Sequence, residues 1–169
     1  MDVVLAVSMA PDTVGMVLLE GEGAGGVTVD QDNFDVGPGL AGAAAADQVI
    51  AAILGTRESA AEGGYELQSS GVTWTDPVEA DALRDALTAH KVENVMLVSA
   101  FAAAAALAQA GGSATSCART ALLFVEPSTA TLAVVNTTDG SIADVQRQPG
   151  PQGTRRHWQA PAEQTPPER

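Results

Sequence analysis

The stretch Val3–Leu19 constrains the fold of this chain more than any other part of the sequence. It contains two runs rich in β-branched and aliphatic residues, Val3–Val7 and Thr13–Leu19, with a Pro-Asp pair between them. Such runs are typical of strands, and Pro-Asp is typical of a turn. The chain is therefore expected to open with a β-hairpin whose turn covers Ser8–Asp12.

The next residues are predicted to alternate between strands and helices. Apolar side chains at spacings of three and four indicate helices, and alternating ones indicate strands. Strands are predicted over Val27–Val36, Tyr65–Trp74, Asn94–Ser99, Thr120–Val125, Thr131–Asn136 and Ser141–Val145, and helices over Leu40–Leu54, Pro77–Thr88 and Phe101–Ala110. Gly55 is expected to end the first helix, although Thr56–Gly64 could extend it, and Gly111-Gly112 is expected to end the third.

Two local signals are specific enough to predict structure at single residues. Asp76 is expected to cap the second helix, with Pro77 at its first position and Glu79 completing an approximate capping box. Asn94–Ser99 is a continuous apolar run, which is typical of a strand buried on both faces.

Composition excludes several classes of function. The chain has 169 residues, ordinarily one domain, and a net charge of −13, which repels a phosphate backbone and argues against nucleic-acid binding. The most apolar stretch, Val95–Ala110, is too short for a membrane span. Met1-Asp2 leads directly into a strand without the basic region of a signal peptide, so a cytoplasmic location is expected.

Residues with catalytic or metal-binding chemistry are sparse. Asp30, Asp32 and Asp35 could suggest a cation loop, but the spacing lacks the glycine and the distal glutamate of a calcium loop. Cys117 is the only cysteine and has no evident catalytic companion, and His90 lies where a cation favours a helix end. No catalytic residue and no metal ligand are therefore predicted.

The composition changes at Gln146. Five of the nine prolines lie between this point and the last residue, and Trp158 is the only large apolar side chain there. We interpret 146–169 as a disordered tail, and a shifted reading frame at codon 146 explains the same composition equally well. The predicted organisation is a lobe over residues 1–118, a hairpin over 119–145 that begins a second lobe, and the tail.

The order of elements indicates an α/β fold with a ribonuclease H-like mixed sheet. Three antiparallel strands come first, helix–strand alternation follows, and a further hairpin opens a second, incomplete lobe. Over residues 3–145 this order resembles the actin-like ATPase superfamily, in which two such lobes each open with a phosphate-binding hairpin. The amino-acid sequence of segments such as Val-Ser-Met-Ala-Pro-Asp-Thr-Val also resembles an uncharacterised family from high-GC bacteria, whose proteins are degenerate members of this superfamily.

The two loops depart from the superfamily's phosphate motifs. The first motif typically reads Asp-x-Gly-Thr-Thr, and here Ser8 stands where the aspartate would position magnesium. The second typically reads Asp-x-Gly-Gly-Gly-Thr, and here Leu123–Thr129 has a proline where glycine is expected. Proline has no amide donor for a phosphate oxygen. The resemblance leaves four candidate vestiges of a nucleotide site: Ser8, Thr13, Ser128 and Thr129.

These departures predict a pseudo-ATPase: a non-catalytic member of the fold that acts as an interaction or regulatory module and holds no cofactor. The alternative is a divergent ATP-binding protein or ATPase with atypical phosphate loops, which would hold magnesium-ATP. A two-metal nuclease is disfavoured because Val3–Val7 carries no carboxylate. The expected partner is an unknown protein or a second copy, joined through an exposed sheet edge of the last hairpin.

Overall fold

The computed structural model describes residues 1–10, 13–21, 26–37, 42–126 and 128–149. A first sheet has the strand order β3-β2-β1-β4-β5, and a second sheet has the order β6-β7-β8. In chain order the elements are β1 Asp2–Met9, β2 Thr13–Glu20, β3 Val27–Asp35, α1 Ala43–Glu62, β4 Glu66–Trp74, α2 Pro77–Ala89, β5 Val95–Ser99, α3 Ala100–Ala114, β6 Arg119–Val125, β7 Thr129–Asn136 and β8 Ile142–Pro149.

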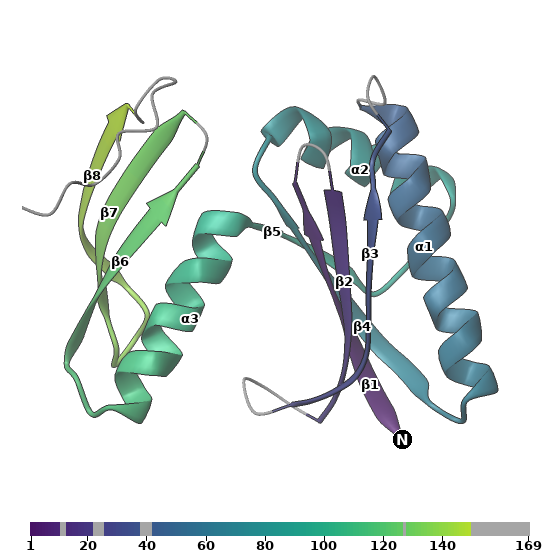
Figure 1. Cartoon of the computed structure of the whole chain (residues 1–169), viewed down its shortest axis with the longest axis horizontal. Coiled ribbons are helices and arrows are strands. Elements are labelled where there is room, and N and C mark those ends of the chain that lie inside the picture. Colours follow the sequence, from purple (N-terminus) through teal and green to yellow (C-terminus); the bar gives the residue numbers. More distant parts are fainter. Residues whose placement is uncertain (11–12, 22–25, 38–41, 127, 150–169) are drawn as a thin grey trace, which may run out of the picture.

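The elements form layers (Figure 1). Helices α1 and α2 cover one face of the first sheet, α3 lies on its other side, and the second sheet lies beyond α3. Strands β1, β2 and β3 pair antiparallel, whereas β4 pairs parallel with both β1 and β5. The expected mixed sheet with three antiparallel strands side by side is confirmed, and so is a second sheet that opens with a hairpin.

The core lies between the first sheet and helices α1 and α2. Alternate residues of β1 and β2 are buried there, because successive side chains of a strand point to opposite faces of the sheet. Helix α1 contributes a stripe at helical spacing, and α2 contributes Leu83 and Leu87. The most deeply buried large side chains of this cluster are Val3, Leu5, Val7, Val14, Val49, Ile50, Ile53, Val72 and Leu83.

Neither helix ends at the glycine predicted to end it, and the alternative that Thr56–Gly64 extends the first helix is confirmed as far as Glu62. Helix α1 continues past Gly55 to Glu62, where Ala60 is buried against the core, and α3 continues through Gly111 and Gly112 to Ala114. A glycine inside a helix costs only about 1 kcal/mol relative to alanine, which tertiary packing readily offsets. At Gly112 the glycine is required by packing, because a Cβ there would overlap Thr120 and Thr137.

Two further predictions are corrected by the position of strands. Strand β5 is not buried on both faces: it is an edge of the first sheet, and Met96 is 65% exposed. Strand β8 extends to Pro149, so residues 146–149 belong to the second sheet and not to a tail. The remainder of the predicted tail, 150–169, lies outside the described residues, as do the turn residues Pro11 and Asp12.

The predicted cap of α2 is confirmed. The Asp76 carboxylate accepts a hydrogen bond from the Val78 amide at 2.9 Å, and Pro77 occupies the first turn. The pKa of the Glu79 carboxyl is raised, first by partial burial and second by the negative charge of Asp76. The start of α2 therefore combines a stabilising cap with a repulsive pair of acids.

Replacing Asp76 by alanine is expected to lower the free energy of unfolding by about 1 kcal/mol, because the first amides of α2 lose their acceptor. Asp76→Asn is the matched control, since asparagine caps as well as aspartate but carries no charge. It is expected to keep the stability and to lower the pKa of Glu79 toward its usual value. Urea unfolding and NMR titration measure the two effects. Equal destabilisation by both variants would contradict the cap as the cause.

Candidate functional site

The first hairpin uses its own amides to close its turn. The Ala10 amide donates to the Thr13 carbonyl at 2.9 Å, and the Thr13 amide donates to the Ala10 carbonyl at 3.4 Å. Each amide has one hydrogen, and in this reciprocal pair that hydrogen points to a carbonyl of the same turn. These two amides are therefore committed to the turn and are not available to a phosphate oxygen.

The second hairpin is closed in the same way. The Glu126 amide donates to the Thr129 carbonyl at 2.8 Å, and the Thr129 hydroxyl donates to the Glu126 carboxylate at 2.9 Å. The hydroxyl and the carboxylate that resemble a phosphate motif therefore bind each other. Ser128 is exposed beside them.

The four candidate residues are not gathered in one cavity. Ser8 lines an apolar groove of about 700 Å³ between the first sheet and α3, together with Gly15 and Leu107. Thr129 lines a separate cavity of about 460 Å³. Neither cavity is lined by Thr13 or Ser128 among the described residues. The geometry therefore separates the vestiges of the two loops.

The cavity lined by Thr129 was not predicted. It lies where β4 and β5 end, and its walls include Trp74, Phe101 and Phe124, with Glu126 and Arg147 at its polar side. The rings of Phe101 and Phe124 meet edge to face, with centroids 5.8 Å apart. The signal in the sequence was the position of Trp74 and Phe101 at the carboxyl ends of adjacent parallel strands, where α/β folds place ligands.

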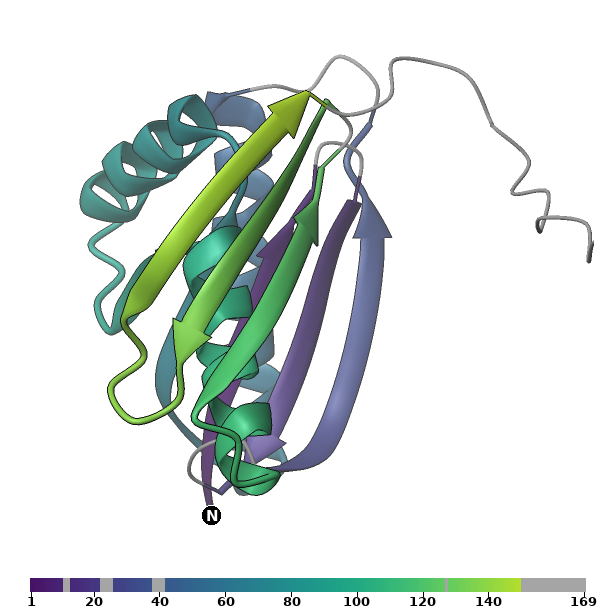
Figure 2. The ribbon, with the colours of Figure 1, turned by 90° about the vertical axis from the view of Figure 1, so that its left-hand side faces the viewer.

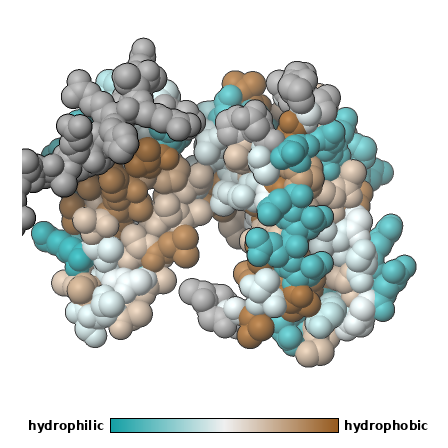
Figure 3. Space-filling model, in the orientation of Figure 1, coloured by the Kyte–Doolittle hydropathy of each residue, from teal (hydrophilic) through white to brown (hydrophobic). Residues whose placement is uncertain are grey.

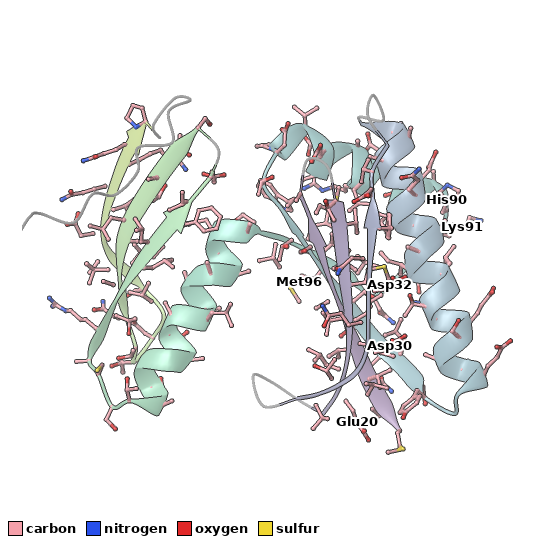
Figure 4. All side chains as sticks on the ribbon, in the orientation of Figure 1. Glu20, Asp30, Asp32, His90, Lys91 and Met96 are labelled. Atoms are coloured by element: carbon pink, nitrogen blue, oxygen red, sulfur yellow. The ribbon has the colours of Figure 1, made fainter. Side chains whose placement is uncertain are left out.

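Acidic residues lie along an edge strand of the first sheet. Asp30 and Asp32 lie along β3, the edge strand of the first sheet (Figure 4). Each carboxylate accepts a hydrogen bond at 2.8 Å from the amide of the next residue, Gln31 or Asn33. Within the described ranges, no group of three or more His, Cys, Asp or Glu side chains is placed to hold a metal ion. Asp30, Asp32 and Asp35 are all exposed.

The remaining polar candidates have structural partners. His90 caps the end of α2, and its Nε2 lies 3.5 Å from an Asp47 carboxylate oxygen on α1. Cys117 is exposed. In the turn before β8, hydrogen bonds from Ser141 lower the pKa of the Asp139 carboxyl. These contacts join elements of the fold and do not converge on a cavity.

The residues of the two hairpins do not fit magnesium-ATP. A triphosphate with its metal needs fixed carboxylates and several free amide donors. The described part of the first hairpin offers the hydroxyl of Ser8 where a carboxylate is needed, and the amides of Ala10, Thr13 and Glu126 are already bonded.

Solved structures share the fold at very low sequence identity. A Ppx/GppA family protein from Aquifex aeolicus matches with a TM-score of 0.58 and 9% identity, over 87% of this chain and 51% of that one. An exopolyphosphatase from Cytophaga hutchinsonii matches at 0.51 and 12%, over 86% and 50%. MreB5 of Spiroplasma citri bound to ADP matches at 0.50 and 13%, over 88% and 52%. The chain thus has the actin-like ATPase fold and spans about half the length of these structures.

Sequence comparison places the chain in a family. No curated protein matches the sequence. In the part of the chain that the structure describes, no helix is long and apolar enough to cross a membrane. One family model matches residues 2–162 and continues past Gln146, so the change in composition there does not mark the end of family-like sequence. The chain belongs to that family, described as a family of unknown function (DUF7159).

Proposed function

We propose that this protein is a non-catalytic member of the actin-like ATPase fold that acts as an interaction or regulatory module. The observation that carries the proposal is the use of hairpin amides within the hairpins: Ala10 and Thr13 bond each other, and Glu126 bonds Thr129. Freeing such groups for a ligand would break two or more hydrogen bonds, each contributing about 1 kcal/mol. A nucleotide would have to offset that cost without a carboxylate-held metal.

The second candidate function is a divergent ATP-binding protein. It is favoured by one observation, the likeness of the fold to MreB5 of Spiroplasma citri, which was solved bound to ADP. The likeness has 13% identity and covers 52% of that chain. It supports a shared fold, and nucleotide binding by the present chain is a proposal. The loops distinguish the two candidates. A shared fold places a hairpin at the same position, but it does not determine whether the amides of that hairpin are free to bind a phosphate.

Magnesium-ATP or magnesium-ADP at about 1 mM is expected to leave the melting temperature unchanged. A ligand present at about 100 times its Kd stabilises the folded state by about 2.7 kcal/mol, which raises Tm by about 5–10 °C for a chain of this size. Differential scanning fluorimetry measures the shift, with a nucleotide-binding protein of the same fold as the positive control. A rise of several degrees would reject the proposed lack of a nucleotide site and favour the second candidate.

The interaction role requires an accessible surface, and the second sheet supplies one. Its edge strand β8 is exposed along its whole length. Edge strands present unpaired backbone groups that can pair with another chain. We infer that the protein associates with a protein partner or a second copy through this sheet, in the cytoplasm.

A further inference from the structure

The two sheets of this chain differ in what covers their outer faces. The outer face of the first sheet is covered by α1 and α2, which bury its apolar residues. The second sheet has α3 on its inner side, and among the described residues no helix lies on its outer side (Figure 2). This outer face consists of Arg119, Ala121, Leu123 and Val125 on β6, Ala130, Leu132, Val134 and Asn136 on β7, and Asp144, Gln146 and Gln148 on β8.

The centre of the outer face is apolar and accessible. Leu123 pairs with Leu132, and they are 64% and 45% exposed, while the neighbouring Val125 is 64% exposed. In the side view of Figure 3, brown, apolar surface is visible over part of the second sheet, whereas teal, hydrophilic surface gathers over β3 and α1. A contiguous apolar patch of this kind marks an interaction site more often than scattered single residues do.

The charge of the outer face indicates which kind of partner can bind it. The protein carries a net charge of −13, so two copies repel each other wherever their acidic surfaces meet. The outer face carries one cation, Arg119, and one anion, Asp144, on opposite edge strands. It is therefore a face with no net charge on which two copies can approach.

We propose that the outer face of the second sheet binds the same face of a second copy of this chain, which deepens the proposed role as an interaction module. A two-fold axis along β7 places β6 of one copy opposite β8 of the other. Arg119 and Asp144 are then offset by two residues, about 7 Å along the strand, within reach of an arginine side chain. Two ion pairs form per dimer, and Leu132 packs near its counterpart.

The size of the face predicts a weak dimer. Three strands about 4.8 Å apart and four rows about 7 Å apart give a footprint well below the roughly 800 Å² per partner of a stable complex. The dimer is therefore expected to exchange rapidly and to form only at high micromolar concentration. Packing of the two apolar centres, and not backbone pairing at an edge, supplies most of its stability.

Sedimentation velocity from about 10 µM to 1 mM tests the proposal, since this range brackets weak association. The wild-type sedimentation coefficient is expected to rise with concentration, and Leu123→Glu with Leu132→Glu is expected to remain monomeric. Arg119→Asp is expected to weaken dimerisation about tenfold, because each ion pair becomes a repulsive pair. Adding Asp144→Arg to it exchanges the two charges and is expected to restore the wild-type dissociation constant.

Controls locate the interface. Leu107→Glu on α3 and Met96→Glu on β5 change equally exposed apolar residues away from the outer face and are expected to leave dimerisation unchanged. Loss of the dimer in either control, failure of the charge exchange, or a monomer throughout would overturn the proposal. These results are independent of magnesium-ATP binding, which alone decides the proposed lack of a nucleotide site.

Discussion

Replacing Gly112 by alanine is expected to lower the free energy of unfolding by about 3 kcal/mol, at the upper end of the usual cost of overpacking. Gly112 is buried on the side of α3 that meets the second sheet. A Cβ atom there would lie far inside van der Waals contact with the methyl group of Thr137 and the hydroxyl of Thr120. The Thr137 hydroxyl is held by the Cys117 carbonyl, so the threonine cannot simply rotate away.

Gly111→Ala is the matched control for this substitution. The two glycines are adjacent in the same helix, but a Cβ on Gly111 meets nothing within 4 Å. Alanine there is expected to raise the stability by up to about 1 kcal/mol through helix propensity. Urea unfolding followed by circular dichroism gives both values. Equal behaviour of the two variants would show that α3 does not pack against β6 and the turn after β7 as described.

The glycine pair also shows where reasoning from sequence alone stops. Gly111-Gly112 was predicted to end a helix because glycine favours helix ends. In the structure Gly112 is needed for the close approach of α3 to a sheet that follows it in sequence. The sequence alone does not distinguish a glycine that ends a helix from a glycine that allows close packing. Only the position of Thr120 and Thr137 distinguishes them.

Elements set by local chemistry could be predicted from the sequence. The opening hairpin follows from two aliphatic, β-branched runs around a Pro-Asp pair, and the start of α2 follows from Asp76 and Pro77. The order of elements then determined the mixed sheet. Burial of β5 could not be predicted, because an apolar run such as Val95–Ser99 is compatible with both a central strand and an edge strand.

The candidate site was predictable in its residues and unpredictable in its geometry. The sequence shows Ser8 in place of an aspartate and Thr129 after a proline. It does not show that the Thr129 hydroxyl is bonded to Glu126, or that Ser8 and Thr129 line different cavities. The hydrogen bond spans only three residues of one turn, whereas the separation of the cavities depends on how α3 lies between the sheets, which involves contacts distant in sequence.

Replacing Ile53 by alanine is expected to lower the free energy of unfolding by about 3–4 kcal/mol. Ile53 is fully buried, at 0% exposure, between α1 and the first sheet, and its removal leaves a cavity that the surrounding β1, β2 and α1 side chains only partly fill. Leu107→Ala is the control, because Leu107 is 70% exposed and its truncation is expected to change stability by less than about 0.5 kcal/mol. Urea unfolding measures both.

The Ile53 and Gly112 variants together test whether the two sheets unfold as one unit. Ile53 lies in the core of the first sheet, and Gly112 lies at the junction of α3 with the second sheet. Because α3 is sandwiched between the sheets, we expect one cooperative transition that both substitutions shift to lower urea. Two transitions, one moved only by Ile53→Ala and the other only by Gly112→Ala, would mean that the second sheet folds independently. The dimer interface would then belong to a separately stable unit, and its Leu123 and Leu132 variants would leave the first transition in place.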